Sequence, residues 1–137
     1  VRHKNDKYYL KSQNIFTPKK PKKDAFEGKI YVLINGSSFS ASSVISAKLK
    51  NDKRAMIIGE ETGGANDGTV AGIYSTQKLP NSKLKLPIGL FLVQPNIEFT
   101  HTMKGVTPDV EIKPTFQQIL EREDLELEWI LKEIKGK

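Results

Sequence analysis

A short apolar run at residues 31–34, followed by an Asn-Gly turn and a cluster of serines, constrains the fold of this chain more than any other feature. The run is Tyr-Val-Leu-Ile, and a continuous stretch of β-branched and aromatic residues predicts a strand buried on both faces of a parallel sheet. After it, the apolar side chains follow helical spacing, at Ala41, Val44, Ile45, Ala47 and Leu49. A buried strand that leads directly into a helix is typical of the α/β class.

The serines between the strand and the helix have two possible roles. Ser37, Ser38 or Ser40 could cap the exposed amides of the helix, which is the commoner use of serine at such a position. A serine at this junction is also well placed to act as a nucleophile. Its hydroxyl stands clear of the sheet, and the unpaired amides and positive dipole of the helix N-terminus can stabilise an oxyanion. The local pattern alone does not decide between the two roles.

Three segments together carry a family resemblance. Residues 35–43 are NGSSFSASS, residues 54–64 are RAMIIGEETGG, and residues 105–112 are GVTPDVEI. In this order and spacing they resemble the tail-specific (C-terminal processing) and tricorn-core serine peptidases. The resemblance implies an α/β fold of the crotonase-like (ClpP-like) type, present in part, with Ser40 as the catalytic nucleophile. The backbone amide of Ala41 is then a candidate oxyanion donor, and Ser43 stands where these families usually have glutamate.

A serine nucleophile needs a base within hydrogen-bond reach. The tail-specific branch would place a lysine at position 65, but this chain has Ala65. The loop that contains Gly63 and Gly64 is more similar to that of the tricorn-core and retinoid-binding-protein-like branch. In that branch the resemblance implies a histidine well upstream of the nucleophile and an orienting carboxylate. Gly63 and Gly64 are expected to form an active-site loop.

The two histidines and the nearby acids offer few candidates for these roles. His3 is interpreted as an exposed residue of a charged tail, whereas His101 precedes the 105–110 loop and could lie close to Ser40. The family carboxylate would fall at position 102, which is threonine, so Glu98 is the nearest acidic candidate. We interpret Asp109 structurally, as a residue that fixes a turn through side-chain to backbone hydrogen bonds.

Charged residues on either side of the second apolar segment are assigned structural roles. Glu60 and Glu61 are expected to lie at the rim of the site or to anchor its loops. Lys48, Lys50 and Lys53 are expected to occupy the solvated face and the end of the helix, away from the chemistry.

The second half of the chain predicts a hairpin. Residues 69–79 and 84–93 are rich in strand-forming residues, and the Pro-Asn-Ser sequence at 80–82 supplies a turn between them. The second arm is strongly apolar and is expected to be largely buried. Pro87 confines that arm to a sheet edge or a bulge. A free strand edge in such a protein could bind substrate by β-augmentation.

Two helices are predicted to follow. Thr115 and Gln118 form a capping-box pattern before a short helix at residues 116–120, and Asp124 caps a last helix. One apolar face of that last helix comprises Leu127, Ile130, Leu131 and Ile134.

Length and charge suggest one domain with a basic leading segment. The 137 residues suit a single modest domain. Residues 1–29 contain nine Lys and Arg against three acidic residues, so the whole net charge of +6 lies there. We expect residues 1–28 to be a basic connector or irregular lead-in, and residues 29–137 to be the C-terminal part of a single catalytic domain. The chain has no cysteine, which excludes disulfides and thiolate chemistry.

These observations predict a serine endopeptidase or C-terminal processing peptidase that acts through an acyl-enzyme on peptides or unfolded proteins. No metal or other cofactor and no nucleic-acid partner is expected. A base supplied by a segment absent from this chain would leave the chain alone inactive, and exposed apolar faces could drive self-association. The resemblance implies a location in the cell envelope or an exported protein. The alternative is a non-catalytic module that binds peptides or hydrophobic ligands. A third hypothesis is a crotonase-like acyl-CoA enzyme.

Overall fold

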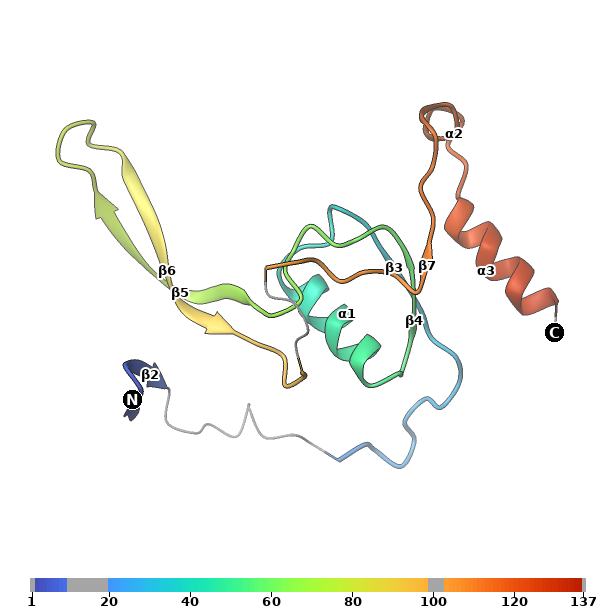
Figure 1. The fold of residues 1–137 in the computed structure, drawn as a ribbon, viewed down its shortest axis with the longest axis horizontal. Coiled ribbons are helices and arrows are strands. Elements are labelled where there is room, and N and C mark those ends of the chain that lie inside the picture. Colours follow the sequence, from blue (N-terminus) through green and yellow to red (C-terminus); the bar gives the residue numbers. More distant parts are fainter. Residues whose placement is uncertain (1, 10–19, 99–102, 137) are drawn as a thin grey trace.

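The computed structural model describes residues 2–9, 20–98 and 103–136 (Figure 1). Short elements follow one another along the chain, and the fold mixes strands with helices. In chain order they are β1 (Arg2–Lys4), β2 (Lys7–Tyr9), β3 (Tyr31–Ile34), α1 (Ala41–Asn51), β4 (Met56–Gly59), β5 (Thr69–Lys78), β6 (Lys85–Val93), β7 (Val110–Glu111), α2 (Phe116–Glu121) and α3 (Leu125–Lys135).

A three-stranded parallel sheet with the order β3-β4-β7 forms the centre of the molecule. Helix α1 connects β3 to β4, as the apolar run and the helical spacing predicted, so this βαβ unit confirms the α/β interpretation. The strands pair in simple register, with Tyr31 opposite Met56 and Ile34 opposite Gly59. Because all three strands run in the same direction, the segments that follow β3 and β4 leave the sheet at one edge.

The prediction that residues 31–34 are buried on both faces is wrong for the described chain. Leu33 is 48% exposed, whereas Ile57 and Ile58 on the neighbouring strand are fully buried. The difference follows from strand order, since β4 lies in the middle of the sheet and β3 at its edge. A continuous apolar run therefore identified the strand but not its position in the sheet.

Helix α1 packs through a face that includes Ala47 of the predicted apolar stripe but not its exposed members Ala41 and Ile45. Ser43, Ser46 and Ala47 are buried, while Ile45 is 58% exposed and Ala41 is exposed as well. The buried residues lie three and four positions apart and so share one helix face. Their small side chains allow the helix to lie close against the sheet, and the Ser43 hydroxyl is satisfied by donating to the carbonyl of Ser40 at 2.9 Å. Small residues, not the larger apolar ones, thus form the contact.

The core of the described chain is small and joins the sheet, α1 and the segment before β7. It comprises Ile34, Ala47, Ile57 and Val106, with Val32, Ala55 and Ile97 packed partly against it. Val106 brings the 105–109 segment into the core, so this segment is fixed to the end of β4 by packing as well as by hydrogen bonds.

Strands β5 and β6 form the predicted hairpin, but the second arm is not buried. Figure 1 shows the two strands as an arm that projects away from the central sheet. Leu84 is 66% exposed, and Leu86, Ile88 and Leu90 are also exposed. A two-stranded sheet with no layer packed on it cannot bury either of its faces. Pro87 lies opposite Thr76 and is compatible with the free edge that each strand of a hairpin keeps.

Both C-terminal helices begin as predicted. Thr115 and Gln118 form a complete capping box at α2, and the Asp124 carboxylate accepts the amide of Leu127 at 2.9 Å at the start of α3. The apolar face of α3 lacks a partner layer among the described residues, since Leu127, Leu131 and Ile134 are all exposed.

The leading segment contains a short hairpin and is tied to the sheet near residues 26–28. Strands β1 and β2 pair in an antiparallel arrangement. The Arg54 guanidinium donates to the carbonyls of Phe26 and Gly28 and lies 5.8 Å from the centroid of the Phe26 ring. None of the helices among the described residues is both long and apolar enough to cross a lipid bilayer.

Candidate active site

Ser40 occupies an unusual backbone position between β3 and α1. Its φ is 55° and its ψ is −116°, a conformation that costs a non-glycine residue about 1–3 kcal/mol and is held only by its surroundings. It is the N-cap residue of α1, yet its hydroxyl makes no capping hydrogen bond. The side chain is exposed and available for another role.

Of the two roles that the sequence left open, the Ser40 hydroxyl does not take the capping one, and Ser37 and Ser38 build the turn. The Ser37 amide donates to Asn35 Oδ1 at 2.9 Å, and the Ser38 hydroxyl accepts the Asn35 amide at 3.1 Å. These bonds close the chain on itself after β3, as Asn and Ser do in tight turns. The turn places Ser40 at the N-terminus of α1 without using its hydroxyl.

Thr69 supplies the polar contact of the Ser40 side chain in the described part of the molecule. The two hydroxyl oxygens are 3.4 Å apart, at the long end of hydrogen-bond range, with Thr69 as donor. Thr69 is the first residue of β5, so the base of the exposed hairpin reaches the strand–helix junction. Sequence reasoning missed this residue, because nothing in the local pattern around Thr69 indicates a contact 29 positions away.

The amide of Ala41, at the start of α1, donates no hydrogen bond among the described residues. Among the described hydrogen bonds, Ser42 donates to the Phe39 carbonyl and Val44 to the Ser40 carbonyl, but none uses the Ala41 amide. The first amides of a helix have no partner within the helix. A developing oxyanion next to Ser40 could therefore accept a hydrogen bond from Ala41.

The structure brings Gly63 and Gly64 against the Ser40 turn. The Gly64 amide donates to the Ser38 carbonyl at 3.0 Å. A Cβ atom on Gly64 would lie 2.3 Å from Ser43 Oγ and 3.0 Å from the Ser40 nitrogen, and one on Gly63 would lie 2.2 Å from the Gly36 carbonyl oxygen. The approach of the two backbones is thus too close for any side chain at either glycine.

Within residues 2–9, 20–98 and 103–136, the hydrogen bonds and ion pairs do not join Ser40 to Glu98 or His3. Glu98 is exposed, and no described hydrogen bond or ion pair joins it to Ser40. His101 and Thr102 lie outside the described residues. His3 is exposed in β1, with its Nε2 atom 4.0 Å from Asp6. No cluster of three or more His, Asp or Glu side chains suited to a metal ion occurs within residues 2–9, 20–98 and 103–136.

Comparison with known proteins identifies the family. The model of peptidase family S41 matches residues 1–112. The chain belongs to peptidase family S41. This result confirms the resemblance to tail-specific serine peptidases, and the S41 match includes the leading 28 residues as well as the Ser40 region.

Two solved structures share the fold of this chain over part of their length. A structure of mature CPAF complexed with lactacystin superposes with a TM-score of 0.57 at 24% identity, over 85% of this chain and 23% of that chain. A crystal structure of mature CPAF gives a TM-score of 0.50 at 26% identity, over 72% of this chain and 18% of that one. The chain thus spans about a quarter or less of the proteins it matches. A search of curated protein sequences found no match.

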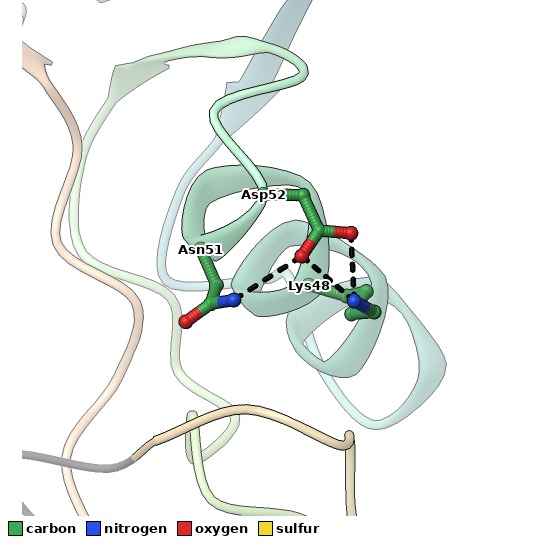
Figure 2. A network of polar contacts seen from close by, with 3 residues as sticks. All are labelled: Lys48, Asn51 and Asp52. Atoms are coloured by element: carbon green, nitrogen blue, oxygen red, sulfur yellow. Dashed lines mark hydrogen bonds and ion pairs between the residues drawn. The ribbon is translucent and has the colours of Figure 1, made fainter.

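Lys48 and Lys50 have structural partners in this S41 chain. Figure 2 shows Lys48 next to the carboxylate of Asp52 at the C-terminal end of α1, with both Nζ–O distances at 2.7 Å. Hydrogen bonds from the Lys48 ammonium and from the side-chain amide of Asn51 lower the pKa of Asp52. Lys50 is more than a solvated residue, since it donates to the Thr107 carbonyl and pairs with Asp109 at 2.8 Å. Both contacts lie at the opposite end of α1 from Ser40.

Asp109 fixes the 105–109 segment to β4. Its Oδ2 atom accepts the Ile57 amide at 2.9 Å, and its own amide donates to the Ile57 carbonyl at 2.7 Å. The predicted side-chain to backbone bond exists, but it crosses to another strand instead of closing a local turn. Glu61 anchors the same segment by accepting the Gly105 amide at 2.8 Å, as expected of a loop-anchoring acid.

This arrangement predicts a pH-dependent contribution of Asp109 to stability. Partial burial raises the pKa of Asp109, but hydrogen bonds from Lys50 and the Ile57 amide outweigh it, so the net pKa is lowered. The stabilisation is therefore fully present above the unfolded-state pKa of about 3.9 and is lost as the pH falls through the lower folded-state pKa. In urea unfolding at a series of pH values, Asp109→Asn should reduce the fall in stability on the acid side by the share that Asp109 contributes. An unchanged slope would contradict the assignment.

Proposed function

We propose that Ser40 is the nucleophile of a serine endopeptidase of the C-terminal processing type. The observation that carries the proposal is the backbone of Ser40, which is held at a positive φ on a strand-to-helix turn while its hydroxyl is left uncapped. Nucleophile elbows have this form, because a strained turn lifts the hydroxyl away from the sheet. Membership of peptidase family S41 supports the same reaction class.

In the proposed reaction the Ser40 oxygen attacks the scissile carbonyl carbon while a general base removes the hydroxyl proton. The Ala41 amide donates to the resulting oxyanion. Collapse of the resulting tetrahedral intermediate breaks the C–N bond, and the base gives its proton to the leaving amine. An acyl-enzyme remains until water hydrolyses it. The base would come from a segment outside this chain. Residues 29–137 would then form the C-terminal part of one crotonase-like catalytic domain, and the chain alone would be inactive.

An active-site fluorophosphonate probe tests this function in the full-length protein. An activated serine attacks the probe, so mass mapping should find the adduct on Ser40, and Ser40→Ala should abolish it. Ser42→Ala is the matched control, because Ser42 is an exposed hydroxyl on the same first turn. Labelling that is absent from the wild-type protein would overturn the proposal.

The substrate class would be extended peptides or unfolded proteins, bound without a cofactor. We place the protein in the cell envelope or outside the cell by analogy with similar peptidases. Recovery of the full-length protein in the cytosolic fraction would contradict that location.

A binding module on the same fold is the competing proposal, and one observation favours it. In the described part of the chain the side-chain contact of Ser40 is Thr69, which is no base at neutral pH, and position 65 holds an alanine in a bridge to Gly105. Peptide or apolar-ligand binding by a full-length protein that is not labelled at Ser40 would support this alternative.

The exposed apolar faces predict self-association of the isolated chain. On the outer half of the hairpin, Leu86 and Ile88 lie opposite Gln77 and Ser75, so they share one face of the sheet. Leu86→Lys should lower the weight-average mass in sedimentation equilibrium, since it places a charge on that face. Thr76→Lys, on the opposite face, is the control. A wild-type chain that stays monomeric across a wide concentration range would refute this prediction.

A further inference from the structure

Thr62 is a buried polar residue that the proposed chemistry leaves unexplained. It follows β4 by three positions and is 4% exposed. A buried hydroxyl is unfavourable unless its hydrogen bonds are satisfied. Here both are: the hydroxyl donates to the Gly64 carbonyl at 2.7 Å and accepts the Val106 amide at 2.7 Å. The Thr62 amide also donates to the Val106 carbonyl at 3.1 Å.

These bonds join three segments that are distant in sequence. Val106 is a core residue of the 105–109 segment, and Thr62 attaches it to the end of β4. Gly64 is the residue whose backbone lies against Ser40, and its amide donates to the carbonyl of Ser38. The Thr62 hydroxyl therefore connects a rigid point of the core to the backbone that packs on the proposed nucleophile.

The Gly64 backbone lies so close to Ser40 and Ser43 that a small shift of Gly64 would affect the position of Ser40. The space for a Cβ atom on Gly64 is already filled by Ser43 Oγ and the Ser40 nitrogen. A shift of the Gly63–Gly64 loop toward the turn would collide with Ser40, and a shift away would break the hydrogen bond from the Gly64 amide to the Ser38 carbonyl, two residues before the strained Ser40. The Gly63–Gly64 loop is held by two hydrogen bonds at Gly64, since the Thr62 hydroxyl donates to its carbonyl and its amide donates to the Ser38 carbonyl.

We propose that Thr62 is a positioning residue for Ser40, acting through Gly64 and not through contact with substrate. This inference rests on the proposed function of Ser40. Without its hydroxyl, the Gly64 carbonyl and the Val106 amide lose these partners, and the loop is free to move; a misplacement of about 1 Å can misalign a nucleophile.

The test compares Thr62→Val with Thr62→Ser in the full-length protein. Valine keeps the shape and removes the hydroxyl, whereas serine keeps the hydroxyl. In Thr62→Val we expect the rate constant of fluorophosphonate labelling and kcat for a peptide to fall at least about tenfold, with KM little changed. Thr62→Ser should restore both rates to near the wild-type values. Thr76→Val, an exposed threonine in the hairpin, is the control and should have no effect.

Several outcomes would overturn the inference. Labelling of Thr62→Val at the wild-type rate would do so, as would equal losses in the valine and serine variants or a loss fully explained by the unfolded fraction in a thermal melt. If Thr62→Val does not fold, Thr62→Cys, which keeps a side chain of similar size and only a weak donor, replaces it in the same comparison. Failure of the proposed function is distinguishable, because the wild-type protein would then not be labelled.

Discussion

Ser40→Ala in the full-length protein is expected to abolish peptide hydrolysis, lowering kcat by about 10⁴- to 10⁶-fold, while the fold is retained. The substitution removes the attacking oxygen and no other described interaction except the long contact with Thr69. The side chain is exposed, so no cavity forms. Alanine has no more difficulty than serine in adopting the positive φ, and the strained turn should persist.

The measurement is single-turnover hydrolysis of a labelled peptide, together with a thermal melt of each variant. Ser37→Ala serves as a second control, since the Ser37 side chain takes part in no described hydrogen bond and lies in the turn before the proposed nucleophile. Hydrolysis by Ser40→Ala within a few-fold of the wild-type rate would remove Ser40 from the mechanism. A lowered melting temperature in Ser40→Ala would instead indicate a structural role.

Gly59→Ala is expected to have the largest effect on stability, at about 2–5 kcal/mol. Gly59 ends β4 at φ 115°, a region that side chains rarely adopt. An added Cβ would lie 2.2 Å from the carbonyl oxygen of Ile34 on the paired strand. That same oxygen accepts the Glu60 amide at 2.9 Å, so the strand cannot retreat without losing a buried hydrogen bond.

Urea unfolding of the full-length protein measures this effect, and Gly36→Ala provides the matched control. Gly36 is also close to the end of a strand, but its φ is not positive and nothing lies within 4 Å of an added Cβ. Equal unfolding midpoints for the two variants would refute the account. Because Ile34 leads into the turn that holds Ser40, we also expect Gly59→Ala to reduce fluorophosphonate labelling.

The elements were predictable where short-range rules decide them. The strand at residues 31–34, the helix that starts after Ser40, the hairpin turn at 80–82 and the caps at Thr115 and Asp124 all follow from residues within one turn of each other. Burial was not predictable in the same way. Leu86 lies in an arm that was expected to be buried and Leu127 on an apolar helix face, yet each belongs to an element without a packed layer among the described residues. An apolar side chain favours burial, but it is buried only where another layer of the structure packs against it.

For the candidate site, the sequence by itself determined that a serine stands between a parallel strand and a helix, because apolar periodicity and turn residues are local properties. The tertiary structure alone decided which atoms surround that serine. Thr69, Gly64 and the Thr62–Val106 bond reach the site from 22 or more positions away in sequence, through the register of β3, β4 and β7. Only the tertiary structure shows that the Ser40 hydroxyl is left uncapped, since capping depends on backbone angles that these packed loops impose.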